Sequence, residues 1–279
     1  MDDLVSTDWL AAHLGDPHLS ILDATLFLPG DTRDAAAEFS AAHILGARLF
    51  DIEALSDSAN PLPHMLGAPA AFGAAMVALG VNRDDQIIVY DDSPLRSSVR
   101  AWFMLRHFGA ERVAILDGGL AKWRAEGRPI ERGDPDPQRE RSAARFNAVE
   151  RPDVVTKVAL LNGTGSALLD ARSRARFEGC EAEPRPGVAP GHIPGARNLP
   201  FAALYRADGT MRGEHELRAA FADAGIDPQA PFIASCGSGV TACSLLFAAR
   251  LLGGRDAQLY DGSWSEYGAD RSAPRQVGP

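Results

Sequence analysis

Short apolar runs alternate along this chain with longer stretches of helical periodicity. Residues 86–90 and 231–235 are short, almost entirely apolar runs, which is typical of strands buried inside a parallel sheet. Residues 99–106 and 242–252 follow them and have the broad apolar faces of helices packed on a sheet. This alternation predicts an α/β fold, with mainly parallel β-sheets flanked by α-helices.

The same pattern occurs twice. His43 and its neighbours at 42–48 recur around His192 at 191–197, a separation of 149 residues. Asp23 recurs as Asp170 and Asp117 as Asp261, in the same order and at separations of 147 and 144 residues. Near-constant separations predict two tandem copies of one folding unit.

The duplication predicts the domain boundaries. We expect a first domain at residues 1–132, which contains no cysteine, and a second domain at residues 154–279, which contains Cys236. The linker at 133–153 contains Pro135, Pro137 and Pro152, which resist regular structure. We expect residues 273–279 to be a disordered tail.

Composition excludes several classes of function. The chain has 279 residues, of which 46% are hydrophobic and 23% charged, as in ordinary globular proteins. Its formal net charge of -9 argues against nucleic acid and anionic membranes as partners. The acidic N-terminus lacks the features of a signal peptide, and three cysteines fit a reducing, cytoplasmic setting. No cysteine–histidine cluster has zinc spacing, so neither a metal nor another cofactor is expected.

Cys236 stands where an apolar run enters a glycine-containing loop, directly before a helical stretch. A helix N-terminus presents unpaired N–H groups and the positive end of its dipole, which favours a thiolate there. Gly237 and Gly239 allow the loop amides to turn inward as an anion-binding cup. The loop therefore predicts covalent sulfur chemistry at Cys236.

Other interpretations of this loop fit less well. Gly237, Gly239 and Ala242 also match the dinucleotide-binding fingerprint, with Asp256 near the distance expected for a ribose contact. Too little chain follows to complete a nucleotide-binding sheet, and the first copy lacks the glycines. A phosphatase of the Cys-x5-Arg type is excluded because Ala242 occupies the arginine position. In the first copy Asp91 stands in place of Cys236, and we expect it to cap a helix.

Three motifs together resemble the rhodanese family of sulfurtransferases. They are Gly-His-Ile-Pro-Gly-Ala at 191–196, Cys-Gly-Ser-Gly-Val-Thr at 236–241 and Asp-Gly-Ser-Trp at 261–264. The resemblance implies two tandem rhodanese-like domains, and it is greatest to the members that act on 3-mercaptopyruvate. Family members that use thiosulfate typically have basic residues after the cysteine, whereas Gly237 and Ser238 are neutral.

The resemblance also implies the roles of individual residues. Arg176 and Arg185 match the positions that grip the carboxylate of the substrate, and Gly237, Gly239, Val240 and Thr241 would line the substrate-binding loop. Ser238, His64 and Glu53 match a proton relay, in which Glu53 replaces the aspartate usual in the family.

The resemblance implies a two-step reaction at these residues. Cys236 takes the sulfur of 3-mercaptopyruvate as a persulfide, releases pyruvate, and passes the sulfur to a thiol such as thioredoxin or to cyanide. One alternative is a thiosulfate:cyanide sulfurtransferase that uses the same cysteine. Another is a rhodanese-like module for binding or persulfide relay with little turnover. We expect a monomer.

Overall fold

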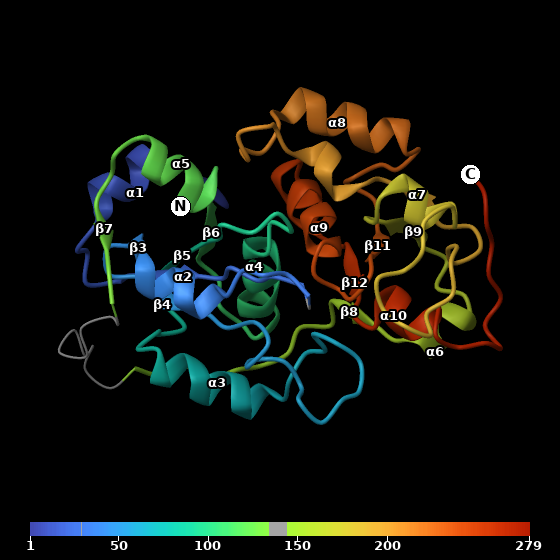
Figure 1. Cartoon of the computed structure of the whole chain (residues 1–279), viewed down its shortest axis with the longest axis horizontal. Helices are drawn as coiled ribbons and strands as arrows, with labels where there is room; N and C mark the ends of the chain where they lie inside the picture. The colour runs from blue at the N-terminus through green and yellow to red at the C-terminus, as the bar shows by residue number, and fades with distance from the viewer. Residues whose placement is uncertain (29, 134–143) are drawn as a thin grey trace. The chain divides into compact units, whose positions relative to one another are not determined.

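The computed structural model describes residues 1–28, 30–133 and 144–279. Two compact units divide the chain (Figure 1). The first unit contains Met1–Asp57, Leu66–Arg151 and Ala207–Met211, and the second contains Ser58–Met65, Pro152–Arg206 and Arg212–Pro279. Pro135 and Pro137 of the predicted linker lie outside the described residues.

The first unit is built on a five-stranded sheet whose strand pairs are all parallel. Its strands, in spatial order, are β1 (Leu4–Val5), β6 (Val113–Leu116), β5 (Gln86–Tyr90), β2 (Leu19–Asp23) and β4 (Arg48–Leu49). Its helices are α1 (Thr7–His13), α2 (Ala35–Ala41), α3 (Pro69–Ala78), α4 (Ser98–His107) and α5 (Gly119–Ala125). A small antiparallel ribbon joins β3 (His43–Ile44) to β7 (Ile130–Glu131).

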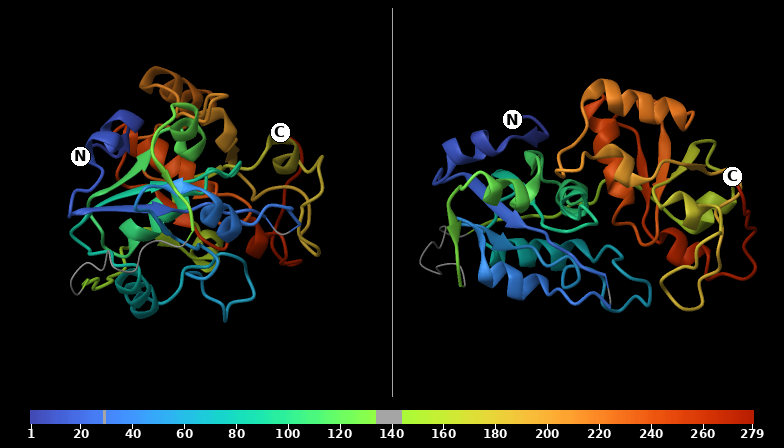
Figure 2. Two further views of the ribbon diagram at one scale, coloured as in Figure 1. Left: turned by 60° about the vertical axis from the view of Figure 1, so that its left-hand side comes forward. Right: turned by 45° about the horizontal axis from the view of Figure 1, so that its top comes forward.

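The second unit repeats this topology. Its strands, in the corresponding spatial order, are β8 (Val154–Val155), β12 (Gln258–Tyr260), β11 (Phe232–Ser235), β9 (Ala167–Asp170) and β10 (Arg197–Asn198), again all parallel. Its helices are α6 (Lys157–Leu161), α7 (Arg174–Phe177), α8 (Glu214–Asp223), α9 (Ala242–Leu251) and α10 (Ser263–Tyr267), with a 3₁₀ turn at Phe201–Leu204. Figure 2 shows helices flanking each sheet. The predicted α/β fold with two tandem copies is confirmed.

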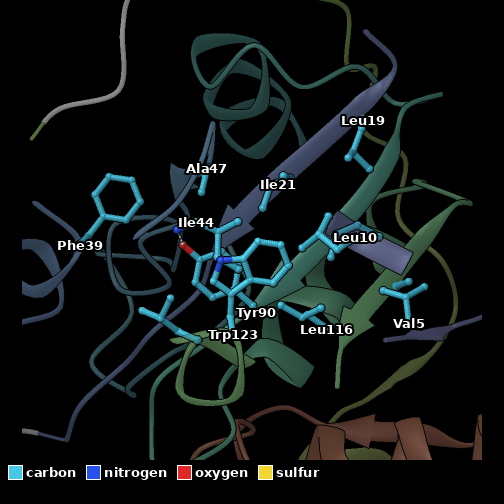
Figure 3. Close-up of a cluster of buried hydrophobic side chains, with 13 residues drawn as sticks. Val5, Leu10, Leu19, Ile21, Phe39, Ile44, Ala47, Tyr90, Leu116 and Trp123 are labelled. Carbon is cyan, nitrogen blue, oxygen red and sulfur yellow. Dashed lines mark hydrogen bonds between the residues drawn. The ribbon is translucent and has the colours of Figure 1, made fainter. Parts of the chain in front are cut away.

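Burial explains why the central strands are so apolar. In β5 and β11 every residue except Gln86 is buried, since helices flank the parallel sheet that contains them. Figure 3 shows the core of the first unit, where Trp123, Ile21 and Leu116 pack around Tyr90. The Tyr90 hydroxyl accepts a hydrogen bond from the Ile44 amide at 3.2 Å, so the polar group of this buried ring is satisfied.

Side-chain caps begin several of the helices. Ser6 and Asp34 in the first unit, and Thr156 and Ser173 in the second, each accept a hydrogen bond from an amide in the first turn of their helix. Such caps satisfy amides that have no partner inside the helix. None of the helices in the described part of the chain is long and apolar enough to cross a membrane.

The predicted disorder of residues 273–279 is wrong. Gln276 and His192 exchange two backbone hydrogen bonds of 2.9 and 3.0 Å, and the Gly278 amide donates to the Glu178 carbonyl at 2.9 Å. The tail thus lies along the segment that follows α7 (Figure 1). The tail is ordered by backbone pairing, which needs no apolar side chain, and Val277 remains 65% exposed.

Candidate functional site

Cys236 is the first residue after β11, the central strand of the second sheet, and α9 begins six residues later. Its side chain is buried, with 2% of its surface exposed. The carboxyl end of a strand in an open parallel sheet is where α/β proteins place their sites. The cysteine therefore lies between the end of a strand and the positive end of the ten-residue helix α9.

The hydroxyl of Ser263 supports the loop that begins at Cys236. Its Oγ accepts hydrogen bonds from the amides of Cys236 and Gly239, both at 3.1 Å, and donates to the Tyr260 carbonyl at 2.8 Å. The Trp264 amide donates to the Cys236 carbonyl at 3.0 Å. These hydrogen bonds fix the backbone of Cys236 and of the loop that follows it.

The remaining loop amides are free to meet an anion. No acceptor among the described residues takes a hydrogen bond from the amides of Gly237, Ser238, Val240 or Thr241. Gly239, in contrast, uses its amide on Ser263 and has a φ of +77°, which favours glycine. The loop thus has the form of an anion-binding cup in which Gly239 supports the backbone.

In the first copy the position that corresponds to Cys236 holds a carboxylate, which accepts hydrogen bonds from loop amides. Asp91 follows β5 as Cys236 follows β11, and its carboxylate accepts the amides of Ser93 and Ser98, both at 2.9 Å. Ser98 is the first residue of α4, so the expected helix cap is confirmed. Burial raises the pKa of Asp91, although both hydrogen bonds oppose that shift.

His64 meets the cysteine loop within the second unit. The segment Ser58–Met65 packs with this unit, and His64 Nδ1 lies 2.8 Å from Ser238 Oγ. His64 is buried and has a φ of +58°, a conformation that non-glycine residues rarely adopt. Glu53 is an exposed residue of the first unit, and its part in the relay stays a prediction.

Arg176 lies against the cysteine loop at Gly237. A Cβ added to Gly237 would come 3.1 Å from Nη2 of Arg176, so a larger residue at 237 would crowd the guanidinium. Arg176 makes a two-pronged ion pair with Glu183, with Nη2–Oε2 at 2.5 Å and Nε–Oε1 at 3.2 Å. Arg185, the second predicted clamp residue, is half-buried in the segment after α7.

A fully buried arginine stands behind this pair. Arg172 contacts Asp170 at 2.7 Å, Glu183 at 2.8 Å and the Gly191 carbonyl at 2.8 Å. Its guanidinium also lies 4.5 Å from the centre of the Trp264 ring. Burial alone would lower the pKa of Arg172, but the two carboxylates outweigh it and the pKa is raised.

Comparison with known proteins decides the family. The rhodanese-like domain matches this chain twice, at residues 6–126 and 155–270. The chain belongs to the rhodanese family.

Similar rhodanese-family proteins cover almost the whole chain. The 3-mercaptopyruvate sulfurtransferase of Escherichia coli (strain K12) is 47% identical over 275 residues, which span 97% of this chain and 96% of that protein. A mitochondrial thiosulfate/3-mercaptopyruvate sulfurtransferase of Arabidopsis thaliana is 37% identical over 98% of this chain and 78% of its own length. The crystal structure of SseA from Escherichia coli, a 3-mercaptopyruvate enzyme with the rhodanese fold, has a TM-score of 0.84 and 44% identity, covering 95% of this chain and 100% of its own.

Sequence reasoning missed three residues of this rhodanese site: Arg172, Glu183 and Ser263. Arg172 follows β9 by two residues. An arginine so close to a buried strand indicates a buried ion pair, because charged side chains are buried only when they are paired. Ser263 lies within the Asp-Gly-Ser-Trp motif, but its bonds to Cys236 and Gly239 depend on a contact across 27 and 24 residues. Among the described residues, no group of three or more His, Cys, Asp or Glu side chains could hold a metal ion.

Proposed function

We propose that this chain is a 3-mercaptopyruvate sulfurtransferase that works through a persulfide on Cys236. The observation that carries the proposal is the buried cysteine at the end of β11, beside a cup of unpaired amides and the N-terminus of α9. The similarity to proteins named for this activity, over nearly the full chain, supports it.

In the first step the Cys236 thiolate attacks the sulfur of 3-mercaptopyruvate. A sulfur–sulfur bond forms, the carbon–sulfur bond breaks, and its electron pair leaves with the carbon as the enolate of pyruvate. A proton then converts the enolate to pyruvate. Amides of Gly237, Ser238, Val240 and Thr241 stabilise the negative charge that develops on the sulfur atoms in the cup.

Ser238 and His64 are suited to supply that proton. Their side chains lie 2.8 Å apart, within the distance for direct proton transfer, both are buried, and Ser238 follows Cys236 by two residues in the loop. Glu53 would orient His64 as the third member of the relay. In the second step a thiol such as thioredoxin, or cyanide, attacks the outer sulfur and restores the Cys236 thiolate, which predicts ping-pong kinetics.

The charges around the loop favour 3-mercaptopyruvate over thiosulfate. The donor is a monocarboxylate whose charge lies away from the reacting sulfur, and Arg176 and Arg185 would bind it. Arg176 already shares its charge with Glu183, which weakens its attraction for a compact dianion. Thiosulfate remains the second candidate, since one similar plant protein is named for both donors.

The remaining features of the proposal concern the whole protein. We propose domains at residues 1–132 and 154–279, a monomeric state, and a cytoplasmic location. The cysteine-bearing copy carries the reaction, because Asp91 in the first copy cannot act as a sulfur nucleophile.

Steady-state sulfur transfer to cyanide, with 3-mercaptopyruvate and thiosulfate compared side by side, tests this function. We expect a strong preference for 3-mercaptopyruvate and complete loss of transfer in Cys236→Ser. Cys180→Ser, which alters an exposed cysteine, is the matched control and should retain activity. A preference for thiosulfate would leave the proposed role of Cys236 intact but would show that thiosulfate is the sulfur donor. Turnover of neither compound would favour a binding or relay module.

A further inference from the structure

Glu183 is a buried carboxylate shared by two arginines. Only 4% of its side-chain surface is exposed, and its two oxygens contact Arg172 at 2.8 Å and Arg176 at 2.5 Å. A buried charge is tolerated when it is paired and hydrogen-bonded, and Glu183 meets that condition through its contacts with Arg172 and Arg176.

Arg172, the first of the two arginines bound to Glu183, is held firmly within the second unit. Arg172 is fully buried and is bound to Asp170 at the end of β9 and to the Gly191 carbonyl. It also stacks on Trp264, whose amide holds the Cys236 carbonyl. Glu183 therefore takes its position from groups that also set the position of the cysteine loop.

The Arg176 side of the pair points to the reaction site. Arg176 is 22% exposed and its Nη2 lies against Gly237, the residue after Cys236. Glu183 binds the edge formed by Nε and Nη2, and a guanidinium has five N–H donors, so other N–H groups remain for an incoming carboxylate. An arginine side chain left unpaired would lose much rotamer freedom on binding, and the ion pair removes that cost beforehand.

We propose that Glu183 is a positioning residue for the sulfur donor, which holds Arg176 beside Gly237 with one edge bound and the rest of the guanidinium presented to the donor carboxylate. This inference rests on the proposed function. If Glu183 instead competed with the donor for Arg176, removal of its charge would raise kcat/KM for the donor.

The test is the kinetics of Glu183→Gln, which keeps the shape of the side chain and removes its charge. We expect kcat/KM for 3-mercaptopyruvate to fall about tenfold, the scale of a charge-assisted hydrogen bond, with kcat/KM for cyanide unchanged. Only the first half-reaction involves the donor carboxylate, so a general structural defect would lower both constants. Adding Arg176→Lys to Glu183→Gln should cost no more than Arg176→Lys alone, because Glu183 acts through Arg176.

Glu181→Gln is the matched control. It removes the same charge from the same segment, at an exposed residue whose carboxylate contacts Ser173. It should behave as the unsubstituted protein. If Glu183→Gln does not fold, Glu183→Asp keeps the charge, and the shorter side chain should lower the donor constant selectively.

Two results would overturn the inference. If kcat/KM for 3-mercaptopyruvate is the same in Glu183→Gln as in the Glu181→Gln control, Glu183 does not position Arg176. If this constant is higher in Glu183→Gln, Glu183 competes with the donor instead. Turnover of neither donor by the unsubstituted protein is a different result, which would remove the proposed function and this inference with it.

Discussion

Ser263 combines an unusual backbone conformation with two functional hydrogen bonds. Its φ is +49°, and the corresponding residue of the first copy is a glycine, Gly119, with a φ of +56°. A left-handed backbone at a non-glycine residue costs about 1 kcal/mol, so the serine is expected where its hydroxyl contributes more than that. Here the hydroxyl satisfies the amides of Cys236 and Gly239.

Substitution of Ser263 separates these two effects. Ser263→Ala keeps the backbone cost and removes the hydroxyl that accepts hydrogen bonds from two buried amides, so we expect the free energy of unfolding of the second unit to fall by about 1–3 kcal/mol. Ser263→Gly also loses the acceptor but relieves the backbone, and it should be less destabilised than Ser263→Ala. Denaturant unfolding of both variants measures this order.

Both Ser263 variants should slow transfer from the donor and transfer to cyanide, because Cys236, the proposed nucleophile, would be displaced. This differs from Glu183→Gln, which should affect only the donor step. Unchanged turnover in both variants would show that the loop keeps its geometry without the serine.

At the scale of elements, the C-terminal tail and the segment after α7 support one another. The tail binds both ends of the stretch between Glu178 and His192, which carries Glu183 and Arg185. Gly191 has a φ of +110°, and an added Cβ would lie 2.4 Å from the Gln276 carbonyl, so the close approach of the tail requires a glycine there.

Removal of residues 276–279 should therefore loosen the segment that carries Glu183 and Arg185, the segment proposed to bind the donor. Three backbone hydrogen bonds would be lost, each contributing about 1 kcal/mol, and we expect a lower kcat/KM for 3-mercaptopyruvate with cyanide kinetics retained. Gln276→Ala is the control, since it keeps the backbone bonds and should have no effect. Identical donor kinetics in the truncated and full chains would contradict a supporting role for the tail.

At the scale of the whole molecule, the two copies differ in how they neutralise one buried carboxylate. Asp170 in the second unit is paired with Arg172, whereas Asp23, its counterpart, accepts bonds from the amide and hydroxyl of Thr25. Burial raises the pKa of Asp23 to about 6, against the hydrogen bonds from Thr25 and Tyr90. The copy that contains Cys236 thus has a cation, Arg172, where the other copy has the hydroxyl of Thr25.

This difference predicts a pH-dependent stability. The pKa of Asp23 is higher in the folded protein, about 6, than its ordinary value of 3.8, so its favourable contribution is present at low pH and is lost as the pH rises through 6. Asp23→Asn removes the ionisation, and it should stabilise the first unit at pH 7, by up to about 3 kcal/mol, but not at pH 4. Thermal unfolding of both proteins from pH 4 to 7 measures the change, and a stability difference independent of pH would contradict it.

The sequence by itself determined the duplicated α/β architecture and pointed to Cys236 as the candidate nucleophile. Both depend on local order along the chain: apolar runs of strand length, helical periodicity, motifs repeated at near-constant separation, and a cysteine directly before a helix. Helix N-termini and strand ends form from neighbouring residues, so their chemistry can be inferred without distant contacts.

Only the tertiary structure decided what surrounds the nucleophile. Ser263 reaches Cys236 across 27 residues and His64 reaches Ser238 across 174, so neither contact is encoded in local spacing. The sequence singled out Arg176 but did not show that it pairs with Glu183, which Arg172 binds in turn, because side-chain ion pairs depend on which loops fold onto the same strand ends. The ordered tail belongs to the same class, since its backbone hydrogen bonds leave no pattern of side chains in the sequence.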